Sequence, residues 1–216
     1  MELSLFQDIL RTVAEAMRIP VIIILILFIA FSVFCIGWII AEFFSERIHM
    51  KYKLPELMDA LKLHRYDLET CITDSGLLRR QKRALIELTK HPDFSEEMLT
   101  SLADSLIEKE RARYDRKLGA TNLISKLAPM AGLLGTLIPL GPGIIALGQG
   151  DTQTLSDSML TAFDTTIAGL IAAGICLVIS SFRKRWYAGY MSDLETLVDS
   201  VVDIELENRG IYNARQ

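Results

Sequence analysis

The sequence predicts an all-α integral membrane protein with three transmembrane helices, two of which extend into a cytoplasmic helical bundle. Two observations support this fold class. Three stretches as long as a bilayer is thick contain no charged residue or only one, whereas charge is dense between them. Half of the 216 residues are apolar, and a soluble protein of this size normally disperses its charged residues along every element. This separation of charged from apolar stretches indicates that some segments of the chain contact lipid and others contact water.

Residues 1–18 are expected to form an external amphipathic helix in the membrane interface. Its apolar residues recur at helical spacing, namely Phe6, Ile9, Leu10, Val13 and Met17. The first span follows over residues 19–41, where no charged residue occurs. At about 1.5 Å per residue this stretch covers roughly 34 Å, enough to cross a hydrocarbon core of about 30 Å. It is too long for a cleaved signal peptide.

Residues 42–126 are predicted to form a cytoplasmic helical domain. We expect two helices at about 55–68 and 77–90, divided by a breaker at residues 73–76. A third helix should begin at Ser95, whose hydroxyl can cap it, and continue without interruption to Gly148. A basic cluster in the second helix is interpreted as a solvated face rather than a nucleic-acid or lipid site, and it comprises Arg79, Arg80, Lys82 and Arg83.

The second span is placed at residues 127–148 and the third at residues 161–182, joined by a short external loop over 149–160. Three prolines and several glycines in the second span predict a kinked membrane helix, since neighbouring helices can satisfy the freed carbonyls. Thr154 and Asp157 form a T-x-x-D pattern that predicts a capping box at the start of the third helix. Residues 183–216 should continue that helix as a cytoplasmic tail. Its apolar stripe comprises Tyr187, Tyr190, Leu194, Leu197, Val201 and Ile204.

The distribution of Lys and Arg predicts the orientation. Basic residues are frequent over 42–126 and at the start of the tail, whereas residues 149–163 contain none. The positive-inside rule therefore places the N-terminus and the second loop outside, with the large loop and the C-terminus in the cytoplasm.

No catalytic or metal-binding pattern is evident, so an enzyme is not expected and no catalytic residue, metal ligand or cofactor is assigned. The three histidines form no cluster with cysteine or acidic residues. The three cysteines, Cys35, Cys71 and Cys176, are interpreted as small buried hydrophobes.

Small residues and hydroxyls line one face of each of the last two spans. In the second span this face holds Gly132, Thr136, Pro139 and Gly143, and in the third it holds Ala162, Thr166, Gly169 and Ala173. Such faces are typical of close helix packing. If both faces look toward a shared axis, their hydroxyls could instead serve a moving ion or its water. Thr136 and Thr166 are therefore candidate ion-path residues.

Asp164 is the only charge within the third span. It lies about 200° around the helix from Thr166, so the two cannot share a face. Two interpretations stay open: a carboxylate in contact with interfacial water, or an ion-access or subunit-contact group.

The last two spans resemble the ExbB/TolQ/MotA family of proton-channel stator subunits. The residues concerned are a proline at 129 followed by Gly-Leu-Leu-Gly-Thr over 132–136, and Thr165-Thr166 followed by Gly169-Leu170. The three-span layout matches the ExbB/TolQ branch. Two departures from the family pattern are the prolines at 139 and 142 and the acidic Asp164.

The resemblance implies a homopentamer in the cell inner membrane, whose second and third spans surround a small single-span ExbD/TolR-like partner with an essential aspartate. It implies passage of H⁺, or possibly Na⁺, past that aspartate as the source of mechanical work. Carried over, Thr136 and Thr166 match the pore threonines, and Thr165 and Asp164 join them as candidate ion-path residues. The candidate residues for pore or helix packing are Gly132, Gly135, Pro139, Gly143, Gly169 and Ala173. A non-conducting membrane scaffold or a secondary transporter component is the alternative function.

Overall fold

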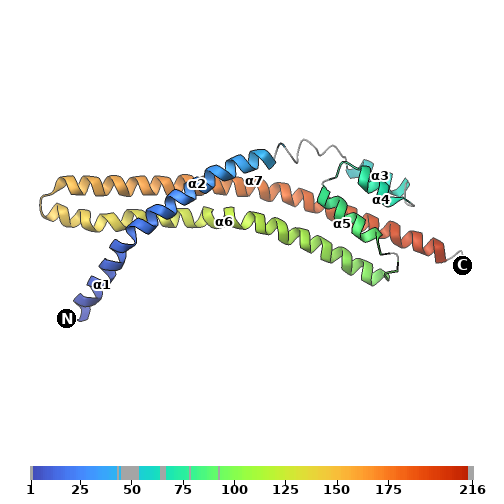
Figure 1. Cartoon of the computed structure of the whole chain (residues 1–216), viewed down its shortest axis with the longest axis horizontal. Coiled ribbons are helices and arrows are strands. Elements are labelled where there is room, and N and C mark those ends of the chain that lie inside the picture. Colours follow the sequence, from blue (N-terminus) through green and yellow to red (C-terminus); the bar gives the residue numbers. More distant parts are fainter. Residues whose placement is uncertain are drawn as a thin grey trace. The chain divides into compact units, whose positions relative to one another are not determined.

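The computed structural model describes residues 2–42, 44, 54–63, 67–77, 79–91 and 93–213 (Figure 1). Across these ranges the regular structure is helical: α1 (Glu2–Ala16), α2 (Arg18–Glu42), α3 (Leu54–Leu63), α4 (Leu68–Asp74), α5 (Arg79–Thr89), α6 (Glu96–Gly148) and α7 (Thr152–Asn213). Three helical stretches are long and apolar enough to cross a membrane, namely Ile9–Glu42, Glu96–Gly148 and Thr152–Asn208. The prediction of an all-α chain with three transmembrane helices, two of them extended, is confirmed.

Two compact units make up the chain. The first comprises Met1–Ile39 and Leu118–Phe182, and the second comprises Ile40–Lys117 and Arg183–Gln216. Each unit is described separately below.

In the first unit, α1 is a helix whose apolar side chains are exposed. The exposed fractions are 60% for Phe6, 52% for Ile9 and 54% for Leu10. The backbone hydrogen bonds from Met17 N to Val13 O and from Val21 N to Met17 O carry the chain directly into α2. The predicted helix is therefore present, with an apolar face that its own chain leaves open.

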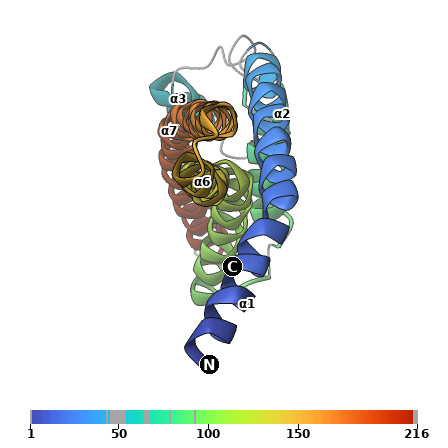
Figure 2. The ribbon, with the colours of Figure 1, turned by 90° about the vertical axis from the view of Figure 1, so that its left-hand side faces the viewer.

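The core of the first unit lies where α2 meets α6 and α7 (Figure 2). Val21 and Leu25 of α2 pack against Ala131 of α6, together with the partly buried Phe28 and Ile138. A second cluster is built almost wholly from alanines, namely Ala128, Ala172 and Ala173, with Phe28, Ile29 and Ile124 beside them. Small residues are the usual contact surface between membrane helices, because lipid supplies no hydrophobic force that would push larger side chains together.

The connection between α6 and α7 is a tight turn and not the predicted loop over 149–160. Gly150 has a positive φ of 78°, which ends α6 in the left-handed conformation that glycine adopts readily. The amides of Gln149 and Asp151 both donate to the carbonyl of Ala146, each at 3.0 Å. Helix α7 then begins at Thr152.

The predicted Thr154–Asp157 capping box is wrong. Asp151 caps α7 instead, because its carboxylate accepts hydrogen bonds from the Thr154 backbone N–H at 3.0 Å and from the Thr154 hydroxyl at 2.5 Å. Asp157 lies inside the helix, where Gln153 donates to it at 3.3 Å. The turn at Gly150 frees the residue directly after it to act as the cap.

The second unit contains three short helices where two were expected. The segment predicted as one helix over 55–68 contains α3 and the start of α4, and residues 64–66 lie outside the described ranges. The supposed breaker also begins too early, since Thr73 and Asp74 belong to α4. Within α4 the Thr73 hydroxyl donates to the carbonyl of Glu69 at 2.7 Å, a local bond that threonine commonly makes inside a helix.

Two long-helix predictions are confirmed. Ser95 caps α6 by accepting a hydrogen bond from the Met98 N–H at 3.3 Å, and α6 continues to Gly148 despite three internal prolines. The stripe in the C-terminal part of α7 is buried, with exposed fractions of 2% for Leu194 and 0% for Leu197 and Val201. Leu61, Ile72, Leu85 and Leu88 of the shorter helices are also fully buried in the second unit.

The cysteines fit their predicted role in part. Cys35 and Cys176 are buried, whereas Cys71 is partly exposed on α4. Burial raises the pKa of the Cys71 thiol, and the nearby carboxylates of Asp67 and Asp74 raise this pKa further. Its thiol is therefore protonated and slow to react at neutral pH.

We expect Asp151→Ala to loosen the start of α7, since the Thr154 amide and hydroxyl both lose their acceptor. Hydrogen exchange should become faster over residues 152–155, whereas Asp151→Asn, which keeps one acceptor oxygen, should change it much less. The hydrogen bonds from Thr154 hold the pKa of Asp151 below its ordinary value of 3.8. The ionised cap is thus fully present at neutral pH and is lost as the pH falls through that lowered pKa. Equal exchange in all three proteins would contradict the cap.

Candidate functional site

The backbones of α6 and α7 approach closely where glycines face each other in the first unit. A Cβ atom at Gly169 would lie 2.6 Å from the Ala128 carbonyl oxygen and 3.0 Å from the Gly132 Cα. A Cβ atom at Gly132 would lie 3.2 Å from the Thr165 carbonyl oxygen. Only glycine therefore fits at Gly169 without a shift of the backbone.

Every small residue that the sequence assigned to helix packing is buried within this single chain. The buried positions are Gly132, Gly135, Pro139, Gly143, Gly169 and Ala173. Gly135 lies under Thr165, since a Cβ atom there would come within 2.6 Å of the Thr165 Cβ. Gly143 faces Ser158 near the turn, where its Cβ atom would lie 3.0 Å from the Ser158 Cβ. The predicted packing faces of α6 and α7 thus meet one another inside one protomer.

The three candidate threonines lie at or beside this contact. Thr165 is 8% exposed, and Thr136 and Thr166 are partly exposed. Each hydroxyl donates within its own helix: Thr136 to the Leu133 carbonyl at 2.7 Å, Thr166 to the Ala162 carbonyl at 3.2 Å, and Thr165 to the Ala162 carbonyl at 2.9 Å. With the proton used in this way, each oxygen keeps its lone pairs free to accept from water or to face a cation.

The side chain of Asp164 is exposed, whereas that of its neighbour Thr165 is buried. Asp164 also lies about 200° around the helix from Thr166, so these two side chains occupy different faces of α7. Among the described residues it makes no hydrogen bond or ion pair, and the structure therefore leaves this carboxylate available to a group outside the protomer.

A small recess opens beside Thr165. It is lined by Arg18, Ile22, Gly135, Ile138, Pro139, Thr161 and Thr165. Proline has no N–H, so Pro139 cannot donate to the Gly135 carbonyl and Pro142 cannot donate to the Ile138 carbonyl. The recess is therefore bordered by two residues whose carbonyls lack their helical donor and by two threonines.

Sequence reasoning missed the contribution of Arg18 and Thr161 to this recess. Arg18 belongs to the external helix predicted over residues 1–18, and no pattern in the sequence assigned it to a site. The signal for the recess was present in the sequence, because prolines four residues after Gly135 and Ile138 identify the carbonyls that lose their donors. What the sequence could not show is that α2 brings Arg18 to the same place.

A further polar contact, also missed, joins α6 and α7. The Ser180 hydroxyl is buried and donates to the Asn122 side-chain oxygen. Nearby, the buried Thr121 hydroxyl donates to the Leu118 carbonyl at 3.0 Å. Hydrogen bonds between membrane helices contribute about 0.6 to 2 kcal/mol each, so the Asn122–Ser180 bond adds to the glycine contact.

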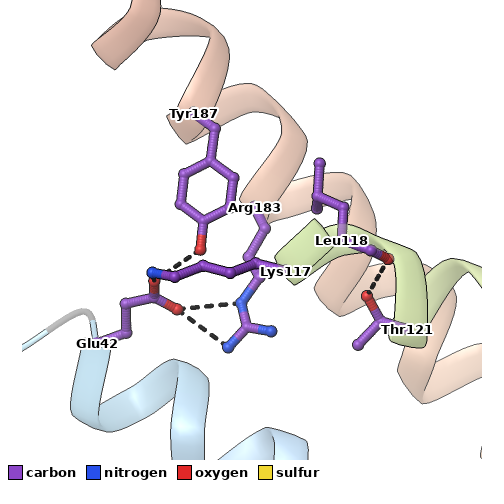
Figure 3. A network of polar contacts seen from close by, with 6 residues as sticks. All are labelled: Glu42, Lys117, Leu118, Thr121, Arg183 and Tyr187. Atoms are coloured by element: carbon purple, nitrogen blue, oxygen red, sulfur yellow. Dashed lines mark hydrogen bonds and ion pairs between the residues drawn. The ribbon is translucent and has the colours of Figure 1, made fainter. Parts of the chain in front are cut away.

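In the second unit, the carboxylate of Glu42 gathers three polar side chains (Figure 3). The Tyr187 hydroxyl donates to Oε1 at 2.6 Å, and the Lys117 ammonium lies 3.4 Å from the same oxygen. The Arg183 Nε donates to Oε2 at 3.1 Å, while its Nη2 lies 3.0 Å from Oε2 as an ion-pair contact without hydrogen-bond geometry. The side chains of Glu42 and Arg183 are only 7% and 6% exposed.

This Glu42 cluster joins α2, α6 and α7 (Figure 3). A buried carboxylate requires compensation of its charge, and here two cations and a hydroxyl supply it. The sequence offered no means of pairing these residues, since Glu42 lies 75 positions from Lys117 and 141 from Arg183.

Among the described residues, no group of three or more His, Cys, Asp or Glu side chains could hold a metal ion. Where α6 and α7 meet, the available chemistry is that of hydroxyl and carbonyl oxygens, the exposed carboxylate of Asp164 and the guanidinium of Arg18 from α2.

Comparison with known proteins gives three matches. A family model described as the MotA/TolQ/ExbB proton channel family matches residues 73–196. A biopolymer transport protein ExbB homolog of Methanothermobacter thermautotrophicus is 30% identical over 125 residues, which cover 49% of this chain and 45% of that protein. Biopolymer transport protein exbB1 of Vibrio cholerae is 28% identical over 134 residues, covering 60% of this chain and 58% of that protein. The chain thus spans about half the length of the curated relatives it matches.

Gly169→Ala should destabilise the protein, because the added methyl group would press on the Ala128 carbonyl. Overpacking of this kind costs about 1 to 3 kcal/mol. Gly174→Ala, on the same helix with nothing within 4 Å of the added Cβ, is the matched control and should be neutral. Thermal unfolding of the purified proteins in detergent measures the difference. Equal melting temperatures would show that the close contact is absent.

Glu42→Gln should destabilise the second unit more than Tyr187→Phe. The first change leaves the buried Arg183 without its counter-charge, which costs about 3 to 5 kcal/mol. The second removes a single hydrogen bond, although one made to a charged group, and should cost about 1.5 to 3 kcal/mol. The same unfolding measurement ranks the two variants, and the reverse order would show that the carboxylate is not the centre of the cluster.

Proposed function

We propose, from the premise that the chain belongs to the MotA/TolQ/ExbB proton channel family, that it is the ion-conducting stator subunit of a motor in the cytoplasmic membrane. The motor converts the H⁺ or Na⁺ gradient into mechanical work. Its moving part is a small single-span ExbD/TolR-like protein that carries an intramembrane aspartate. We further propose that the subunit forms a homopentamer around this partner.

The observation that carries the proposal is the chemistry of the α6–α7 hairpin. It offers threonine hydroxyls at Thr136, Thr165 and Thr166, and each keeps acceptor lone pairs. Within residues 19–41, 127–148 and 161–182 the one charged residue is Asp164, which is exposed, and Arg18 lies directly before the first of these ranges. A hairpin that offers hydroxyls but no buried carboxylate in these ranges can line an ion path, but the group that binds and releases the ion must come from another protein.

The exposed surface of the first unit suits an assembly in lipid. Large apolar side chains point outward from both helices of the hairpin, with exposed fractions of 58–60%. They include Leu133, Leu137, Ile144, Phe163, Leu170 and Leu177. Each of these can meet acyl chains or the helices of a neighbouring copy. In the proposed assembly Asp164 provides an ion-access carboxylate on this outer surface.

One observation favours the second candidate, a non-conducting membrane scaffold or transporter component. The glycine faces of α6 and α7 are used for packing within one chain, and the threonine protons are bonded within their own helices. A scaffold needs nothing more than this. The two functions differ in whether the hydroxyl oxygens are required for ion flow.

The double substitution Thr136→Val with Thr166→Val distinguishes them, because valine keeps the side-chain shape and removes the hydroxyl. The purified subunit, in complex with the proposed single-span partner, would be placed in liposomes containing a pH-sensitive dye. We expect proton flux to fall about tenfold or more, equivalent to about 1.4 kcal/mol in the barrier. The oligomer mass, measured by light scattering, should stay unchanged.

The matched control is Thr136→Ser with Thr166→Ser, which keeps both hydroxyls and should retain most of the flux. Unaltered flux in the valine variant would leave the scaffold function in place. Loss of flux in both variants would show that the methyl groups and not the hydroxyls matter, and the proposed ion path would be wrong.

A further inference from the structure

A charged groove lies between α5 and α6 in the second unit. It is lined by Arg80, Arg83, Ala84, Glu87, Leu102, Ser105, Leu106, Lys109, Glu110 and Arg113. The residues from α6 follow spacings of four and three, so they belong to a single face of that helix. The groove contains four cationic side chains and two carboxylates.

Both carboxylates of the groove already have partners. Glu87 pairs with Lys90 at 3.3 Å, and Glu110 pairs with Arg113 at 3.0 Å. By contrast, Arg80, Arg83 and Lys109 are exposed and make no ion pair among the described residues. The groove therefore presents three uncompensated positive charges.

An uncompensated acidic row lies on another face of the same unit. Asp199, Asp203 and Glu207 of α7 are four residues apart, so they form one line along the helix. All three are exposed, and none makes a hydrogen bond or ion pair among the described residues.

The acidic row points away from the core of its own protomer. Asp199 lies about 200° around the helix from Leu197, which is fully buried in the stripe that packs against the rest of the unit. Glu195 lies one turn before Asp199 on the same line of α7, and it already pairs with Arg111 of α6 at 2.7 Å. The three carboxylates that follow it make no such pair among the described residues, and none of them meets the cations of the groove in its own chain.

We propose that the acidic row of one copy docks on the α5–α6 groove of the next copy. Two different and complementary surfaces on one protomer make a head-to-tail contact, and such contacts close into a ring when the rotation between copies allows it. This inference rests on the proposed function only in that the subunit must assemble with itself. It adds an electrostatic contact made outside the bilayer.

A lipid headgroup is the less suitable occupant of the groove. Its last residue, Arg113, lies 14 positions before the apolar run that begins at Leu127, which is about 21 Å along a helix. The ordered spacing of the acidic row also matches a groove between two helices better than a single phosphate group.

Charge reversal tests the contact. In the full chain, purified in detergent, Arg80→Glu with Arg83→Glu should raise the apparent dissociation constant of the oligomer about tenfold or more, because like charges then face each other. Asp199→Lys with Asp203→Lys should do the same. Combining all four changes should restore assembly. All the altered side chains are exposed, and Glu69→Lys with Asp74→Lys on α4 is the control that should have no effect.

Disulfide trapping provides a second measurement that does not depend on stability. In a background with Cys35→Ala, Cys71→Ser and Cys176→Ala, the pair Arg83→Cys with Asp203→Cys should give a ladder of covalent multimers on oxidation of the membranes. Asp203→Cys paired with Glu69→Cys should not.

The outcomes separate this contact from the proposed function. A monomeric wild-type chain would overturn both. An intact oligomer that is insensitive to the reversals, or a disulfide formed only within one chain, would overturn this contact alone. Binding of anionic vesicles that is lost with the arginine reversals, without any change in assembly, would assign the groove to lipid and also overturn it.

Discussion

Where α6 and α7 pass each other at Gly132 and Gly169, the two backbones leave no room for a methyl group. In hydrocarbon no hydrophobic force draws helices together, so association depends on van der Waals contact at short range and on a few hydrogen bonds. The glycines allow that range, and the Asn122–Ser180 hydrogen bond adds to it. The larger apolar side chains are consequently displaced to the outer surface of the hairpin, where they are free to meet lipid or other subunits.

The same contact determines where the hydroxyls lie. Thr165 is held over Gly135, and Pro139 sits beside them at the recess. A change in the helix packing would therefore move the hydroxyl oxygens as well, so packing and ion passage cannot be treated as independent functions of these residues. Because of this coupling, the glycine and threonine pattern fits both a scaffold and a channel. The two functions can be distinguished only by a substitution that removes the hydroxyl oxygen and keeps the volume of the side chain.

The sequence was sufficient for the features that depend on long-range composition. Charge-free runs identified the spans, and helical periodicity identified the buried stripe through Leu194, Leu197 and Val201. The sequence was insufficient where two neighbouring residues could each cap the same helix. Asp151 and Thr154 are both good caps, and only the positive φ at Gly150 decides between them. The Glu42 cluster was also inaccessible, since periodicity tells which residues share a face but not which distant charges meet.

Charged residues in the second unit have different roles, depending on whether they are buried or exposed. Glu42 and Arg183 are desolvated, so their attraction is strong and the loss of either leaves a costly buried charge. Arg80, Arg83 and Asp203 are exposed and make no ion pair in the part of the chain that the structure describes, so they contribute little to the fold of one protomer. Their charge acts only when a second surface displaces the water around them. Buried pairs can therefore hold the helices of a subunit together while exposed charges are left to determine which surfaces of neighbouring subunits meet.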